Sequence, residues 1–143
     1  MDNRIEEELR RLAGGRCEYC HLPEEFVRLK HVTDHIIARQ HGGGDDKKNL
    51  AVCCGRCNRS KGPNIAGIDP KSGKLVRLFH PRRHKWSTHF HWDGPVLAGR
   101  TAIGRATIVV LAINDPMRVA LRESLLREGF SLDWPISARR AAK

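Results

Sequence analysis

The chain has 143 residues, enough for one compact domain with a small appended unit, but only 6% of them are aromatic. Its net charge of +10 predicts an anionic partner such as a nucleic acid, unless the lysines and arginines only solvate the surface. The sequence has neither an apolar run of the ~18 residues that a membrane span needs nor the apolar segment of a signal peptide. We therefore expect a cytoplasmic protein with reduced thiols.

The first part of the chain predicts a helix followed by a β-β-α unit. Apolar residues recur at helical spacing from Ile5 to Leu12, and two glycines follow, which predicts an amphipathic helix over residues 3–13. The next unit comprises a strand over residues 27–33, a glycine-rich loop over 40–48, a strand over 49–53 and a helix over 55–61 that ends at Gly62-Pro63. The first strand would deliver Asp34 and His35 at its C-terminal end.

The remaining residues predict an extension of strands and helices. We expect a turn-rich linker over residues 64–74, strands over 75–80, 86–92 and 96–101, an apolar segment over 102–113, and a frayed tail over 137–143. A last helix over 116–128 is favoured because Asp115 is a good N-cap and Pro116 suits the first helical position. The predicted domains are residues 1–63 and an extension, 64–143, packed on them.

Four of the five cysteines form two Cys-x-x-Cys pairs, which are Cys17/Cys20 and Cys54/Cys57. The two-residue gap lets both sulfurs of a pair reach one ion, and four thiolates make a tetrahedral zinc site. The 33 residues between the pairs leave room for the β-β-α unit to be looped out and pinned at both ends. Cys53 and His21 are alternative ligands, but Cys54 preserves the gap and four cysteines suffice. The competing reading is a set of ordinary buried cysteines.

A group of polar residues around the second strand and the short helix suits phosphodiester hydrolysis. This reaction needs a base for water and a cation that offsets charge on the phosphate. His35 is the candidate base, since imidazole can be neutral near pH 7. Asp34 and Asn58 offer oxygen ligands to Mg²⁺, which takes few protein ligands, and Lys61 lies one turn after Asn58 where it can reach the phosphate. Further basic residues nearby are Arg39, Lys47, Lys48, Arg56 and Arg59.

These motifs resemble those of the HNH endonucleases, also called ββα-metal or His-Me finger nucleases, over roughly residues 17–62. The resemblance rests on the cysteine knuckles, Asp34-His35-Ile36, the Gly-Gly loop, Asn49-Leu50 and the Asn-x-x-Lys-Gly ending. It implies an α+β fold: a ββα-metal core with a structural four-cysteine zinc site, an N-terminal helix and a C-terminal extension of strands and helices.

The resemblance also implies a role for each signature residue. His35 would be the general base, and Asp34 and Asn58 would bind a catalytic Mg²⁺ or Mn²⁺. Asn49 would orient the base through backbone hydrogen bonds and shape the loop. The third signature position is often histidine and is Asn58 here, which leaves the identity of the metal open, and the usual proline is Ala38.

A second set of motifs lies in the extension. His89-Phe90-x-Trp92 and Gly104-Arg105-Ala106-Thr107 resemble an extension found in a bacterial subset of the family. We expect the Trp/His segment to build the core of an accessory hairpin, in preference to ring contacts with substrate or a second metal at His89 and His91. The remaining histidines are expected at the surface, namely His31, His80 and His84.

The sequence thus predicts a bacterial or phage-like endonuclease that cuts DNA, with structural Zn²⁺ and catalytic Mg²⁺ or Mn²⁺. Arg39, Arg56, Arg59 and Lys61 would contact phosphates. Alternatives are a zinc-containing nucleic-acid-binding module without catalysis and an RNA-directed nuclease or RNA-binding protein. A protein-interaction zinc domain is disfavoured by the +10 charge.

Overall fold

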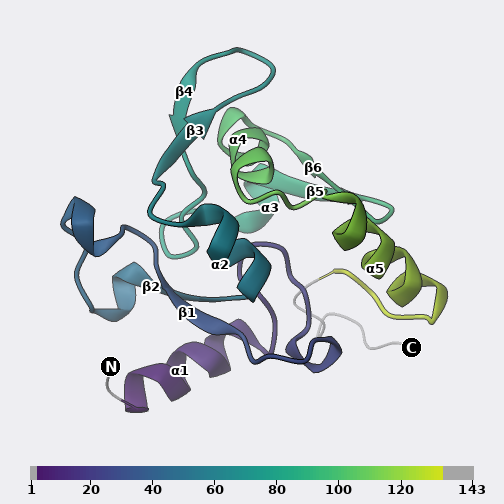
Figure 1. The fold of residues 1–143 in the computed structure, drawn as a ribbon, viewed down its shortest axis with the longest axis horizontal. Coiled ribbons are helices and arrows are strands. Elements are labelled where there is room, and N and C mark those ends of the chain that lie inside the picture. The colour runs from purple at the N-terminus through teal and green to yellow at the C-terminus, as the bar shows by residue number, and fades with distance from the viewer. Residues whose placement is uncertain (1–2, 134–143) are drawn as a thin grey trace.

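The structure, a computed structural model, describes residues 3–133, so the predicted tail at 137–143 lies outside the described residues. The helices are α1 (Asn3–Ala13), α2 (Gly55–Lys61), α3 (Trp86–His89), α4 (Ala102–Val110) and α5 (Pro116–Arg127). The strands are β1 (Val32–His35), β2 (Leu50–Cys53), β3 (Ala66–Ile68), β4 (Leu75–Arg77), β5 (Phe90–Asp93) and β6 (Val96–Gly99). They form three antiparallel pairs, β1-β2, β3-β4 and β5-β6 (Figure 1). This arrangement confirms the α+β class.

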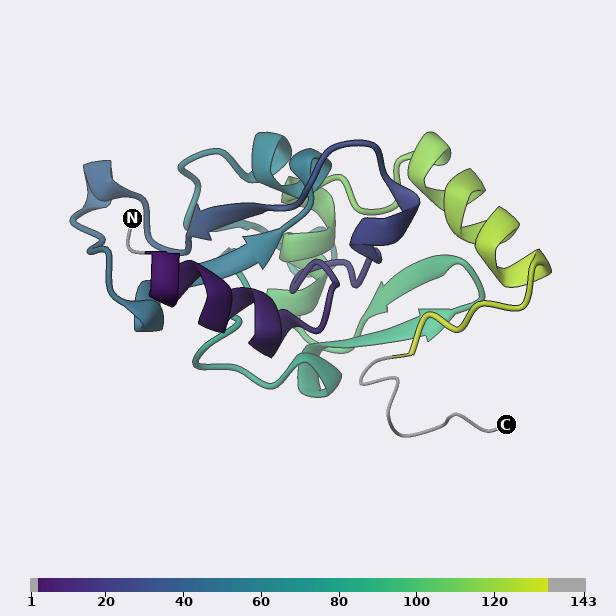
Figure 2. The same cartoon turned by 90° about the horizontal axis from the view of Figure 1, so that it is seen from below.

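The β1-β2 pair and α2 form the predicted β-β-α unit. In the β1-β2 register, Asp34 lies opposite Ala51 and His35 opposite Leu50. Helix α1 lies along this pair (Figure 2), and its apolar face packs Leu9 and Ala13 against Leu50. Helices α1 and α2 have the predicted bounds, because apolar spacing and glycines at their C-terminal ends define both.

The strand predicted over residues 27–33 is wrong, since β1 begins at Val32 and contains Asp34 and His35 rather than ending before them. The segment before β1 wraps around a carboxylate instead. Glu24 Oε2 accepts hydrogen bonds from the His31 backbone N–H at 2.6 Å and from Arg10 at 3.0 Å. His31 was expected at the surface but is buried, with Nε2 2.8 Å from the Leu22 carbonyl oxygen.

The extension departs from the prediction in several respects. Residues 64–74 are not only a linker, because they contain β3, whose Gly67 lies against α4. A Cβ at Gly67 would come within 2.5 Å of Val110 Cγ2, so only glycine allows this approach. Residues 86–92 are not one strand, since α3 occupies the first four positions before β5. His80 was expected at the surface and is buried, with burial lowering its pKa to about 4.

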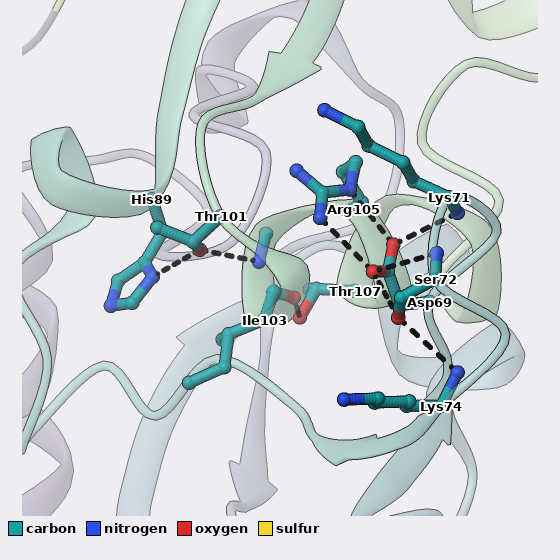
Figure 3. A network of polar contacts seen from close by, with 10 residues as sticks. Asp69, Lys71, Ser72, Lys74, His89, Thr101, Ile103, Arg105 and Thr107 are labelled. Carbon is teal, nitrogen blue, oxygen red and sulfur yellow. Dashed lines mark hydrogen bonds and ion pairs between the residues drawn. The ribbon is translucent and has the colours of Figure 1, made fainter.

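The Gly104–Thr107 motif has a structural explanation (Figure 3). A Cβ at Gly104 would lie 2.1 Å from the His89 carbonyl oxygen, so glycine lets α4 meet the end of α3. Arg105 forms a bidentate ion pair with Asp69 in the β3-β4 turn, at 2.8 and 3.0 Å. Thr107 Oγ1 accepts from the Phe79 backbone N–H and donates to the Ile103 carbonyl. The motif therefore holds α4, the β3-β4 turn and the segment after β4 together.

One apolar cluster joins the β-β-α unit to the extension. It contains the zinc-candidate cysteines and Tyr19 together with extension residues such as Phe79, Phe90 and Leu111. Trp86 and Trp92 pack against this cluster, which confirms that the Trp/His segment builds core, and Trp86 Nε1 donates to the Tyr19 carbonyl at 2.9 Å. Among residues 3–133, no helix combines the length and apolar character needed to cross a membrane.

Candidate functional site

A cleft of about 400 Å³ lies between the end of β1 and α2. Its walls include three of the residues expected to take part in catalysis, Asp34, His35 and Asn58. Arg39 and Gln40 line the cleft from the loop after β1, and Pro63 lines it from the end of α2. The β1-β2 pairing and the short helix therefore bring a carboxylate, an imidazole and an amide to one opening.

His35 is held by an acidic residue from the loop that follows β1. Its Nε2 lies 2.7 Å from Asp45 Oδ1, and 22% of the His35 side chain is exposed. Arg39 donates to the same carboxylate oxygen through Nε and NH2, at 3.2 and 3.1 Å. Hydrogen bonds from His35 and Arg39 lower the pKa of Asp45. An ionised carboxylate at this place favours the tautomer with hydrogen on Nε2, which leaves the lone pair on Nδ1.

The loop that carries Asp45 is shaped by Asn49 and Gly43. Asn49 accepts a hydrogen bond from the Ile37 backbone N–H at 2.8 Å and donates to the Ile37 and Gly44 carbonyls at 2.9 and 2.8 Å. A Cβ at Gly43 would overlap the Ile37 carbonyl oxygen at 1.7 Å. The Gly-Gly and Asn-Leu motifs thus close one compact loop, through backbone bonds of the kind that the family resemblance implies for Asn49.

Asp34 is 5% exposed and has two partners from distant segments. The Tyr19 hydroxyl donates to Oδ2 at 2.8 Å, and Lys61 Nζ lies 3.2 Å from the same oxygen. Burial raises the pKa of the Asp34 carboxyl, and Lys61 and Tyr19 offset this effect only in part. The carboxylate is therefore held in place but incompletely stabilised.

Lys61 is 1% exposed, so its ammonium group lies inside the protein. Besides Asp34, Nζ donates to the His35 carbonyl at 3.1 Å. Lys61 was expected to contact a phosphate, and its ammonium group is instead the buried counter-ion of Asp34. Its charge lies behind the cleft, beside the two residues at the end of β1.

The cleft residues fit a hard divalent cation by donor chemistry. Asp34 supplies a carboxylate and Asn58 an amide carbonyl, both of which are oxygen donors that Mg²⁺ and Mn²⁺ accept. Burial raises the pKa of Asp34, and a divalent cation bound in the cleft would lower it by favouring the carboxylate.

The four predicted zinc ligands, Cys17, Cys20, Cys54 and Cys57, converge, with their sulfurs all within 4.8 Å of one another. The Cys20 and Cys54 sulfurs are 3.7 Å apart. A tetrahedral zinc with bonds of about 2.3 Å requires a sulfur separation of about 3.8 Å, so the geometry fits this ion. Neither His21 nor Cys53 belongs to the cluster. His21 stacks on Trp86 instead, with ring centroids 3.9 Å apart.

Arg118 of α5 contacts the cysteine cluster from the extension. Its NH2 donates to Cys57 Sγ at 3.0 Å and lies 3.8 Å from Cys54 Sγ. Burial alone would lower the pKa of Arg118, but attraction to the Cys57 and Cys20 sulfurs outweighs it and raises the pKa. Four thiolates around Zn²⁺ carry two net negative charges, so a buried guanidinium is a fitting neighbour.

The remaining phosphate-contact candidates differ in how they are held. Arg39 is exposed and paired with Asp45. Arg56 forms an ion pair with Asp115 at the start of α5. Arg59 is exposed on α2, next to the cleft residue Asn58.

Sequence reasoning missed Tyr19, Asp45 and Arg118. Tyr19 lies between the two cysteines of the first knuckle, and no local pattern indicates that its hydroxyl reaches Asp34. Arg118 comes from an ordinary basic helix. Asp45 had a signal, because an acidic pair in a glycine-rich loop is unusual in a chain of net charge +10.

Comparison with known proteins agrees with this geometry. Residues 17–64 match the family model described as HNH endonuclease. The chain is also similar to the Septu protein PtuA of Bacillus mycoides (strain KBAB4), with 25% identity over 148 positions. This alignment covers 87% of the chain but only 21% of the relative. No solved structure gives a significant match. The chain therefore carries an HNH endonuclease domain at residues 17–64, with four cysteines placed to hold a zinc ion.

Proposed function

We propose that this protein is a metal-dependent endonuclease that hydrolyses phosphodiester bonds in DNA. The observation that carries the proposal is the cleft in which Asp34, His35 and Asn58 meet within the HNH-matched segment. The net charge of +10 supports a polyanionic substrate. The substrate is proposed as DNA, and RNA is the alternative that the experiment below separates from it.

In the proposed mechanism, His35 is the general base. Its Nε2 donates to Asp45, and Nδ1 takes a proton from the attacking water. Asp45 acts as a positioning residue, since it fixes the ring and stabilises the imidazolium that forms without touching substrate. Asn49 holds the loop so that Asp45 stays opposite His35.

Asp34 and Asn58 would hold the divalent cation, which offsets charge on the scissile phosphate and the leaving oxygen. Tyr19, in the first cysteine knuckle, would hold the Asp34 carboxylate in place through the hydrogen bond from its hydroxyl. Lys61 balances the buried charge of Asp34 whenever that carboxylate is ionised. The exposed Arg59 would contact the phosphate backbone beside the cleft.

The test is a nicking assay on supercoiled plasmid with purified, zinc-loaded protein and Mg²⁺ or Mn²⁺. The wild type should cut, and His35→Ala should lower the rate by about 100- to 10,000-fold, because general-base catalysis contributes 10²–10⁴-fold. His35→Ala should retain the wild-type melting temperature and DNA affinity. His41→Ala, in the same loop but outside the cleft, is the matched control and should cut normally.

Two results would contradict the proposal. A wild type that binds plasmid but cuts it with neither metal would indicate a binding module. A wild type that cuts structured RNA and leaves DNA intact would reassign the substrate.

A further inference from the structure

The β3-β4 hairpin, residues 66–77, is called the arm below. It begins three residues after Pro63, a cleft residue, and projects beyond α2 and α4 (Figure 1). At about 3.3 Å per extended residue, the tip at residues 71–72 lies at most about 30 Å along the chain from Pro63. That reach is shorter than one turn of duplex DNA, which rises about 34 Å.

The arm has one packed face and one bare face. Gly67 and Val76 are cross-strand partners, and Gly67 lies against Val110 of α4. Successive residues of a strand face opposite sides, so the next pair, Ile68 and Leu75, points away from α4. These two side chains are 53% and 71% exposed. Two large aliphatic side chains are therefore paired on the outer face, and most of each side chain is open to solvent.

The charges of the arm are unopposed. Lys71, Lys74 and Arg77 are exposed, and the only acidic residue between positions 66 and 77 is Asp69. Asp69 is 0% exposed and forms its ion pair with Arg105 (Figure 3). Since Asp69 is shielded and neutralised, the arm presents only positive charge to solvent.

The tip is also preorganised. Asp69 accepts hydrogen bonds from the backbone N–H groups of Lys71 and Ser72 and from the Ser72 hydroxyl, at 3.1, 3.2 and 2.7 Å. The Asp69 backbone N–H donates to the Lys74 carbonyl at 2.9 Å. A turn fixed in this way loses little conformational entropy on binding, which favours a role in recognition.

We propose that the arm binds double-stranded DNA beside the cleavage site. Lys71 and Lys74 contact phosphates, while Ile68 and Leu75 lie against sugars and base edges in the groove. Apolar side chains flanked by basic ones are a common way of engaging a groove. Unopposed positive charge favours DNA over a protein partner. This inference rests on the proposed function in one respect, namely that the nucleic acid bound is DNA.

The test measures DNA affinity by fluorescence anisotropy on a 30-bp duplex over a salt series, in the His35→Ala background so that no cutting occurs. Lys71→Ala/Lys74→Ala should weaken binding at least tenfold at 0.1 M salt and make the salt slope less negative by about 1.8, since each phosphate contact contributes about 0.9. Ile68→Ser/Leu75→Ser should weaken binding about fivefold and leave the slope unchanged, because apolar contacts release no counter-ions.

Matched controls are Lys30→Ala/Lys85→Ala and Leu29→Ser, which change exposed residues outside the arm. If the arm and control lysine variants lost DNA affinity equally, the proposal would be overturned, because the net positive charge of the protein would then explain both losses. The proposal would also be overturned if both arm variants bound DNA as tightly as the wild type. The same holds if their only change were a different sedimentation coefficient, which would point to contacts between protein molecules. Plasmid nicking by the wild type is scored separately. If the wild type cuts plasmid but the arm variants bind DNA normally, only the proposal about the arm is refuted. If the arm variants bind DNA more weakly but the wild type does not cut, only the proposed nuclease activity is refuted.

Discussion

Two buried carboxylates, Asp34 in the cleft and Asp69 in the arm, have opposite environments. Asp69 receives five donors, two of them from Arg105, and these hydrogen bonds lower its pKa. Among residues 3–133, the Asp34 carboxylate has only Tyr19 and Lys61 as hydrogen-bond or ion-pair partners, and burial raises its pKa. A carboxylate whose oxygens accept many hydrogen bonds stabilises the fold. A carboxylate at a cleft with few donors retains the capacity to bind a cation. Both side chains are buried carboxylates, so burial and formal charge alone do not show which of them could bind a cation.

The most direct test of the difference between Asp34 and Asp69 is to replace each carboxylate with an uncharged amide. Asp34→Asn should lower plasmid cutting by at least about 100-fold, because an amide is a weaker cation ligand. Asp69→Asn should leave kcat at saturating DNA unchanged for each folded molecule and lower the melting temperature by about 5 °C. Circular dichroism melts and nicking rates at 25 °C check both. An inactive but stable Asp69→Asn protein would contradict the assignment.

Zinc ligation is the next largest effect, because Tyr19 reaches Asp34 from the first cysteine knuckle. Cys57→Ser should lose bound zinc and unfold at a temperature at least about 10 °C lower, since zinc binding contributes directly to folding free energy. Cys53→Ala is the matched control, as Cys53 is buried beside the cluster without belonging to it. Metal content by mass spectrometry should show one zinc in the control. If zinc-free Cys57→Ser folded as stably as the wild type, the structural role proposed for the zinc site would be refuted.

The pH dependence of stability should separate the two carboxylates. The pKa of Asp69 is lowered in the folded state, so its contribution is fully present above its ordinary value of 3.8 and is lost as pH falls below it. The difference in unfolding free energy between wild type and Asp69→Asn should therefore shrink progressively below about pH 4. Urea melts from pH 6 to pH 3 measure it. A difference that grows on acidification would reverse the sign assigned to Asp69.

The smallest expected effect concerns Asp45, which contacts the proposed base. Asp45→Asn should lower kcat about tenfold without changing KM or the melting temperature, because the ring of His35 loses a charged orienting partner. Asp45→Glu should restore part of the rate. Asp46→Asn is the control, since the Asp46 side chain makes no capping hydrogen bond. The ¹⁵N chemical shifts of His35 should report a changed tautomer in Asp45→Asn only.

Sequence patterns predicted the parts of this protein that depend on local rules. Helices α1 and α2 have recognisable ends, and four sulfurs at two-residue spacing converge as expected. The strand over residues 27–33 failed because alternation there reflects wrapping around Glu24 rather than sheet pairing. Strand β3 was missed because Gly67 looks like a turn residue until Val110 is placed against it.

Within the candidate site, two of the three residues that sequence reasoning missed, Tyr19 and Arg118, are identified only by contacts between segments distant in sequence. Tyr19 and Asp34 are 15 positions apart, and Arg118 and Cys57 are 61 apart. No window of local sequence contains either pair. The partner of a functional group therefore emerges only when the chain is folded.

The contact between Arg118 and Cys57 limits how the protein can be dissected. A fragment ending at Pro63 would keep every HNH signature residue but lose the guanidinium that donates to the Cys57 sulfur. It would also uncover Tyr19 and the cysteines where Phe79 and Phe90 now cover them. The unit that surrounds the cysteine cluster thus includes α5 and extends well beyond the HNH-matched residues 17–64.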